Sequence, residues 1–188
     1  MGAWCLRGKG GRSAALAAVL LAPGLALGAN ILVNPGYETG SLTPWFQLLD
    51  YGGATNWTTT SADVHTGAFS ATNQGNKLMV QYFAPVPTSL ITVASVWVKN
   101  PNALFNAIYL EYSDATSGSG LFSTTGQWQY VDFTAWLTPG KSLVAVGMWG
   151  YSSGGTDERT YVDDWRVEVI PEPASLLLLA AAALLRRR

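Results

Sequence analysis

Between residues 30 and 170, short runs rich in Val, Thr, Tyr, Phe and Trp alternate with clusters of Gly, Pro, Asn, Asp and Ser. This pattern is typical of β-strands joined by turns, and no helical period of 3.6 residues accompanies it. The expected strands are 30–33, 56–61, 77–83, 90–99, 105–112, 127–135, 142–149 and 160–169. The polar stretches 113–125 and 151–159 are expected to be loops. Strands at this spacing predict an all-β jelly-roll sandwich of about eight to ten strands.

Alternation along the expected strands separates core faces from outer faces. Ile108 and Leu110 are expected in the core, opposite Tyr109 and Glu111 of the same strand. In the seventh expected strand, the residues predicted to face the core are Val144, Val146 and Met148. The outer faces therefore carry aromatic rings with small or acidic residues between them.

Aromatic rings on an outer face can stack on the apolar faces of sugars, while polar neighbours bind the sugar hydroxyls. The candidate carbohydrate-binding residues are Trp57, Tyr109, Glu111, Trp128, Tyr130 and Trp149. The alternative is that these rings cover the sheets or pack beneath long loops.

Charge and composition exclude several classes of function. The segment 30–170 holds eleven acidic and five basic residues, a net charge of −6, which makes a nucleic-acid partner a poor fit. The single cysteine, Cys5, lies in the part expected to be removed, which excludes disulfides, thiolate metal sites and a cysteine nucleophile. His65 is the only histidine, and no phosphate-binding loop or histidine cluster is present. A non-catalytic domain is expected.

The first 29 residues have the layout of a secretion signal. A basic stretch containing Arg7, Lys9 and Arg12 precedes an apolar stretch, which ends at the small residues Gly28 and Ala29. This order predicts an N-terminal signal helix and export, with cleavage after Gly28 or Ala29. A membrane anchor is the alternative, but the apolar stretch is short and is interrupted by a Pro-Gly pair.

The segment 171–188 contains Pro171, Glu172 and Pro173, a run of Leu and Ala, and a basic end. The basic end consists of Arg186, Arg187 and Arg188. This order resembles the PEP-CTERM sorting signal of Gram-negative bacteria. The resemblance implies a short hydrophobic helix in the inner membrane, cleavage by an exosortase, and delivery to the cell surface or extracellular matrix. The apolar stretch 174–185 has 12 residues, whereas a bilayer-spanning helix takes about 20, so only transient insertion is expected.

Four motifs of the segment 30–170 resemble those of jelly-roll carbohydrate-binding modules of the galactose-binding-like superfamily. The segment 30–40, Asn-Ile-Leu-Val-Asn-Pro-Gly-Tyr-Glu-Thr-Gly, followed by Trp45, is similar to their opening strand and loop. His-Thr-Gly-Ala-Phe-Ser at 65–70 is similar to a turn into the next strand, and Gln81 matches a glutamine of the strand after it. Tyr-Val-Asp-Asp-Trp-Arg-Val at 161–167 is similar to the closing strand. The resemblance implies the same fold for the whole segment.

Asp163 alternates with Trp165 and Val167, so it is expected on the core side, where a lone carboxylate is costly unless it is paired or hydrogen-bonded. In the resembling modules a calcium ion ties the first loop to the last strand. The resemblance implies that Glu38 and Asp163 or Asp164 are ligands here, with carbonyl groups from 66–68. The alternative is a carboxylate that caps loop amides.

Three functions are therefore compatible with the sequence. The first is an exported surface protein that binds polysaccharide through aromatic side chains. The second is an architectural matrix protein without a specific ligand, and the third is a glycan-active hydrolase. The sequence favours the first over the second, and both over the third.

Overall fold

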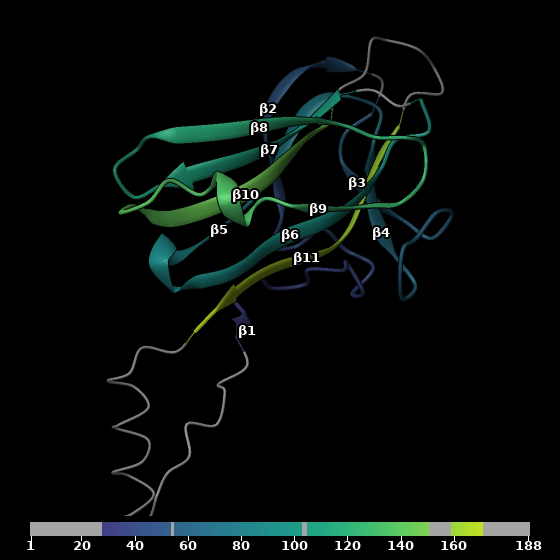
Figure 1. The fold of residues 1–188 in the computed structure, drawn as a ribbon. Helices are drawn as coiled ribbons and strands as arrows, with labels where there is room; N and C mark the ends of the chain where they lie inside the picture. Colours follow the sequence, from purple (N-terminus) through teal and green to yellow (C-terminus); the bar gives the residue numbers. More distant parts are fainter. Residues whose placement is uncertain (1–27, 54, 103–104, 151–158, 171–188) are drawn as a thin grey trace, which may run out of the picture.

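The computed structural model describes residues 28–53, 55–102, 105–150 and 159–170, which form a sandwich of two antiparallel sheets (Figure 1). The six-stranded sheet has the spatial order β3 (Thr58–Thr60), β4 (Ser70–Asn73), β11 (Thr160–Val169), β6 (Ile91–Lys99) and β9 (Gln129–Asp132), with β1 (Ala29–Asn30) also paired to β11. The five-stranded sheet has the order β2 (Phe46–Gly53), β5 (Gly75–Pro87), β10 (Ser142–Gly150), β7 (Phe105–Tyr112) and β8 (Ser117–Ser123). The expected all-β jelly-roll sandwich is thereby confirmed.

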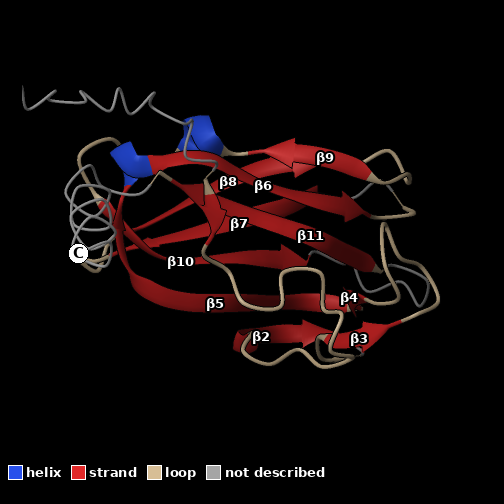
Figure 2. Cartoon of the chain, turned by 90° about the horizontal axis from the view of Figure 1, so that it is seen from below, coloured by secondary structure: helices blue, strands red, loops and turns tan. Residues whose placement is uncertain are grey.

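Two short 3-10 helices, η1 (Thr88–Leu90) and η2 (Thr134–Trp136), lie at the same end of the sandwich (Figure 2). The side chain of Trp136 packs against Gly120 of β8, where the Cβ of any larger residue would overlap the indole. Glycine at this position therefore lets η2 close one end of the space between the sheets.

Eleven strands lie in the described part of the chain, three more than the sequence located. Each of the eight expected runs contains or overlaps a strand, whereas β2, β4 and β8 were not expected. The prediction that 113–125 is a loop was wrong, because 117–123 pairs with β7 along its whole length. This Ser- and Gly-rich strand has little β-propensity of its own, and its ladder with β7 supplies the order. The other expected loop, 151–159, lies almost wholly outside the described residues.

The predicted facing of β7 is correct, because Ile108 and Leu110 are buried in the core and Tyr109 and Glu111 are not. The prediction for β10 was wrong at one position. The pairing of β10 with both its neighbours shifts register between Leu143 and Ala145, so Leu143 joins the core in place of Val144. Strict alternation cannot foresee such a bulge.

Aromatic contacts join the loop after β1 to the centre of the core. Trp45 packs on Trp165 with ring centroids 5.0 Å apart, and the Trp165 indole donates a hydrogen bond to the Tyr37 hydroxyl at 2.9 Å. Gln81 of β5 bonds both the N–H and the C=O of Val33, each at 2.8 Å. These bonds fix the first loop against both sheets.

The chain enters and leaves the domain side by side, because β1 pairs with the end of β11 (Figure 1). Ala29 is opposite Val169, and Asn30 is opposite Glu168. Among the described residues, no helix is long and apolar enough to cross a membrane. The expected signal segment 1–29, apart from its last two residues, and the whole tail 171–188 lie outside the described residues, and so do the helices expected at both ends.

Candidate functional site

The outer side of the five-stranded sheet carries aromatic side chains around one carboxylate. Strand register arranges this surface in three rows of neighbours: Tyr82–Ala145–Glu111, Val80–Gly147–Tyr109 and Leu78–Trp149–Ala107. We call Tyr82, Tyr109, Glu111 and Trp149 the tyrosine–tryptophan face. Tyr82 is exposed, and the other three are half-buried. The face therefore presents ring surface and polar groups to solvent from three adjacent strands.

Glu111 joins the two tyrosines. Its Oε2 accepts a hydrogen bond from the Tyr82 hydroxyl at 2.5 Å and from the Tyr109 hydroxyl at 3.0 Å. Burial, together with the bond to the Glu111 carboxylate, raises the pKa of both phenols to about 12. Both hydroxyls thus stay protonated near neutral pH, point at Glu111, and keep oxygen lone pairs that can accept bonds from a ligand.

Trp149 borders a hollow next to this pair. Its indole N–H donates to Oδ1 of Asn76, which fixes the orientation of the ring. The hollow has a volume of about 290 Å³ and is lined by Ala107, Tyr109, Ser117, Gly118, Ser119 and Trp149. Small-molecule sites typically start at about 300 Å³ and combine apolar walls with a few polar groups. The hollow therefore lies close to the lower end of that size range.

Phe46 extends the aromatic surface onto β2. Its ring is stacked on Tyr82 with centroids 5.8 Å apart and an angle of 17° between the planes. Sequence reasoning missed Phe46 because β2 was not expected, and it missed Tyr82 although alternation with Met79 and Gln81 places it on the outer side. That alternation within the expected strand 77–83 was the available signal.

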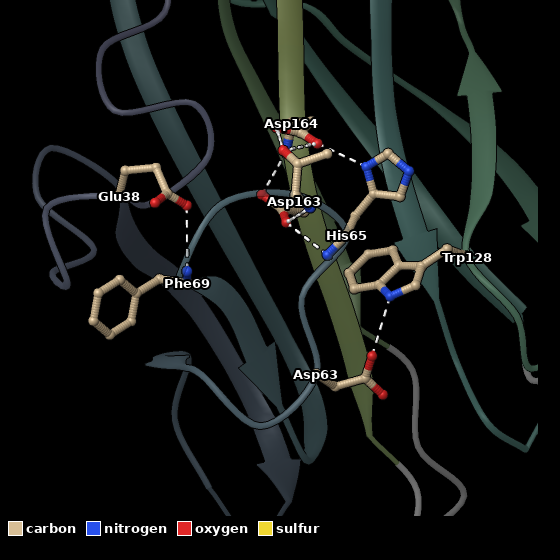
Figure 3. A network of polar contacts seen from close by, with 8 residues as sticks. Glu38, Asp63, His65, Phe69, Trp128, Asp163 and Asp164 are labelled. Carbon is tan, nitrogen blue, oxygen red and sulfur yellow. Dashed lines mark hydrogen bonds and ion pairs between the residues drawn. The ribbon is translucent and has the colours of Figure 1, made fainter.

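Trp128 and Tyr130 lie on the other sheet, away from the tyrosine–tryptophan face. Tyr130 of β9 is opposite Trp97 of β6, and their ring centroids are 5.5 Å apart. The Trp128 indole donates to Oδ1 of Asp63 at 3.1 Å (Figure 3). The six sequence candidates therefore do not form one site.

The structure corrects the prediction that Trp57 is a carbohydrate-binding residue. It is only 3% exposed and belongs to the core, where its indole N–H donates to the Lys77 carbonyl at 2.9 Å. The strand that follows it, β3, is short and lies at the edge of its sheet, and the ring turns inward. Trp57 is thus removed from the candidate ligand-binding residues.

The three acids expected at the cation site lie close together around the loop 61–69 (Figure 3). Glu38 accepts hydrogen bonds from the amides of Ala68, at 2.9 Å, and Phe69, at 3.2 Å. Between these donors and β3, Gly67 has a φ of +70°, and any Cβ there would overlap the Glu38 carboxylate. The glycine of the Thr-Gly turn is therefore required for this contact.

The aspartate pair holds the start of the same loop. Asp163 Oδ2 accepts the amides of His65, at 2.9 Å, and Thr66, at 3.2 Å. Asp164 Oδ2 lies 2.7 Å from His65 Nδ1 and accepts the Thr66 hydroxyl at 2.8 Å. Burial, and then the charge of Asp164, raise the pKa of Asp163 to about 6.

Asp163 is fully buried, but the expectation that it faces the core was wrong. Asp164 has a φ of +48°, and the pairing with β6 shifts register between Asp163 and Arg166. This bulge turns Trp165 and Val167 into the core while Asp163 stays on the outer side, under the loop. The bulge lies at the Asp-Asp pair itself.

Oxygen ligands of this kind are those that calcium prefers. In the structure, however, each of the six carboxylate oxygens has a hydrogen-bond donor within 3.2 Å. Among the described residues, no three His, Cys, Asp or Glu side chains are grouped to hold a metal ion. Calcium would have to replace some of these donors, and the geometry observed is that of carboxylates capping loop amides.

Two structures illustrate the similarity of the fold. The structure of TmCBM61 in complex with β-1,4-galactotriose aligns with a TM-score of 0.53 and 19% sequence identity. The alignment covers 76% of this chain and 99% of the TmCBM61 chain. The enzymatically active domain of tailspike protein 4 from bacteriophage CBA120 aligns with a TM-score of 0.56 and 12% identity, covering 75% of this chain and 21% of its own. No family model and no curated protein matches the sequence. At these identities, the likeness concerns the β-sandwich fold.

Proposed function

We propose that the segment 30–170 is an exported, non-catalytic domain that binds polysaccharide through the tyrosine–tryptophan face. The arrangement of Tyr82 and Tyr109 on one Glu111 oxygen, beside Trp149 and its hollow, carries this proposal. Rings fixed in this way can stack on a pyranose without first losing side-chain freedom. The phenol and carboxylate oxygens then meet the hydroxyl groups.

Charge favours a neutral glycan at this face. Glu111 is the single charged residue in its three rows of side chains, and a negatively charged sugar would meet that carboxylate without a compensating cation. The fold shared with TmCBM61, whose structure contains β-1,4-galactotriose, makes β-1,4-galactan oligosaccharides the first probe.

The face also favours binding over hydrolysis. Glycoside hydrolysis generally requires two carboxyl groups about 5 to 10 Å apart across the scissile bond. The described rows of the face supply one, Glu111, and its Oε2 already accepts bonds from two phenols.

A glycan array combined with retention on insoluble polysaccharides tests the proposal. Neutral glycans should bind, and Tyr109→Ala or Trp149→Ala should weaken binding about tenfold or more, because each removes a ring contact. Tyr161→Ala, a half-buried tyrosine on the six-stranded sheet, is the matched control and should bind normally. Absence of binding to every glycan favours the architectural role, and release of reducing sugar indicates a hydrolase.

We further propose that the segments at the two ends determine export and sorting. Residues 1–29 act as a signal peptide at the inner membrane of a Gram-negative bacterium. The tail 171–188 is a PEP-CTERM-like signal for an exosortase, which delivers the domain to the cell surface or the extracellular matrix. The pairing of β1 with β11 is compatible with this route, because it places Ala29 and Val169, close to the points where the two segments join the domain, side by side (Figure 1).

A structural calcium ion is part of the proposal. Glu38, Asp163 and Asp164 are the ligands, with carbonyl groups from 66–68. The ion would offset two of the three carboxylate charges and tie the first loop to β11, and it would take no part in chemistry.

A further inference from the structure

A second hollow lies on the outer side of the six-stranded sheet, opposite the tyrosine–tryptophan face. It has a volume of about 350 Å³, within the range of small-molecule sites. Its lining includes Trp97, Tyr130, Asp164 and Arg166, together with Asn30 and Pro35. The hollow thus combines two aromatic rings with a cation, a carboxylate and an amide, and the first site uses none of these residues.

The rings of this hollow are held in place by their neighbours. Trp97 is stacked on His65 with centroids 3.8 Å apart and an angle of 17° between the planes. His65 is in turn fixed by Asp164, whose Oδ2 lies 2.7 Å from Nδ1 (Figure 3). Tyr130 lies beside Trp97 and is 48% exposed. One face of the indole is therefore covered by protein, and Tyr130 is the ring most open to a ligand.

Polar groups surround these rings. Arg166 makes an ion pair with Oε1 of Glu168 at 2.6 Å through one nitrogen, and its side chain is 57% exposed. A guanidinium has five N–H donors, so this pair leaves others for a ligand. Ser95 is the cross-strand neighbour of Arg166, and its hydroxyl is buried without a hydrogen-bond partner among the described residues. An unpartnered buried hydroxyl costs stability and marks this part of the sheet as polar but incompletely satisfied.

We propose that this hollow is a second glycan site, which takes a neutral pyranose by stacking on Tyr130 and hydrogen bonding to Arg166. The acidic surroundings, with Asp164 and Glu168 beside one arginine, disfavour a uronic acid. The ligand class rests on the proposed function, whereas Tyr130 and Arg166 have no part in it. Two sites on opposite faces let one domain bind two polysaccharide chains at once and cross-link them.

The test uses the exported protein expressed from the full-length chain, on an array of neutral and acidic oligosaccharides that includes β-1,4-galactotriose. The double variant Tyr109→Ala/Trp149→Ala disables the first site. It should still retain neutral glycans, and adding Tyr130→Ala and Arg166→Gln should abolish that retention. Tyr130 and Arg166 are exposed, so their substitution should leave the melting temperature within a few degrees.

Cross-linking gives a second readout. Mixed with soluble β-1,4-galactan, or with whichever neutral polysaccharide the array identifies, the wild-type protein should raise light scattering. Each double variant, Tyr109→Ala/Trp149→Ala or Tyr130→Ala/Arg166→Gln, should bind the polysaccharide without raising light scattering. If Tyr109→Ala/Trp149→Ala alone abolishes all binding, the second site does not exist and the first stands. If binding that persists in this variant survives Tyr130→Ala/Arg166→Gln, or is confined to acidic glycans, the second site as proposed is wrong. If the wild-type protein retains no glycan, both proposals fall.

Discussion

The Tyr82 hydroxyl reaches Oε2 of Glu111 at 2.5 Å across an intervening strand. Tyr82 lies on β5 and Glu111 on β7, and Ala145 of β10 is the register partner of both. Because the alanine side chain is a single methyl group, the phenol can lie over it and meet the carboxylate. A small residue on β10 therefore allows a polar link between β5 and β7, the strands on either side of it.

This link predicts how the pKa values of the two tyrosines change when Glu111 loses its charge. Glu111→Gln removes the negative charge that favours the neutral phenols, so the pKa of Tyr82 and Tyr109 should fall from about 12 towards the ordinary 10. Burial, the largest cause of the shift, remains, so the fall should be partial. Phenolate absorbance measures it, with Tyr82→Phe and Tyr109→Phe to assign the signals. Glu168→Gln is the control, and an unchanged titration in Glu111→Gln would contradict the observed hydrogen bonds.

The core position of Trp57 predicts a stability effect without a binding effect. Trp57→Ala leaves a large cavity and removes the donor to the Lys77 carbonyl, at a cost of about 3 to 5 kcal/mol. Denaturant unfolding measures this loss. Trp57→Phe, which keeps most of the volume, should be milder and should bind glycans as the wild type does. Loss of binding by folded Trp57→Phe would return this residue to the list of ligand contacts.

Alternation was sufficient to predict the facing of the long, aliphatic strands. Ile108 and Leu110 are in the core as expected, and Tyr109 lies on the outer side. Bulges defeated the same reasoning at Val144 and Asp163, because one extra residue reverses the side chains on one side of it. No single-sequence pattern reveals where such a residue is inserted.

The candidate site could be predicted only in part, because the sequence does not reveal strand order. Tyr109 and Trp149 become neighbours through the adjacency of β7 and β10, whereas Tyr130 belongs to the other sheet. Alternation assigns all three to outer faces and cannot tell the two faces apart. Phe46 was missed for a different reason, since its strand is an edge strand, ordered by pairing with β5.

The raised pKa of Asp163 predicts an unusual pH dependence. Its folded pKa of about 6 exceeds the ordinary value of 3.8, so between these values the folded state holds the proton more tightly than the unfolded chain. Without calcium, this group's contribution is most favourable below about pH 4 and is lost as pH rises to about 6, on the order of 3 kcal/mol. Asp163→Asn should remove this slope. Comparison of urea unfolding for the two proteins isolates the effect, and parallel stability curves would contradict it.

If calcium binds at this site, the stability lost as Asp163 ionises should be restored by the ion. An ion that binds only the folded state stabilises it by about 3 kcal/mol at a hundredfold excess over Kd. A chelator should therefore lower the melting temperature of the wild type. Glu38→Ala should lower it as well and should make the protein insensitive to chelator. An unchanged wild-type melt with chelator leaves the alternative, in which Glu38 only caps the amides of Ala68 and Phe69.

The last prediction concerns sorting. Two prolines lack amide donors, and the first disfavours a helical conformation before it, so Pro171-Glu172-Pro173 should stay an extended strip between β11 and the apolar run. The positive-inside rule keeps Arg186 to Arg188 in the cytoplasm, which leaves the strip on the outer side of the inner membrane, open to an exosortase. Replacing all three motif residues with alanine should extend the helix and conceal the cleavage site.

In cells, this triple variant should accumulate as uncleaved precursor in the inner membrane, and the amount at the cell surface should fall. Fractionation with immunoblotting measures both. The control is Ile170→Ala, because this exposed residue lies just before the motif and its loss leaves both prolines in place. If the triple variant reached the surface at normal size and in normal amount, the tail would be no sorting signal. Its apolar run of 12 residues would then act only as a weak membrane anchor, since about 20 are needed to span a bilayer.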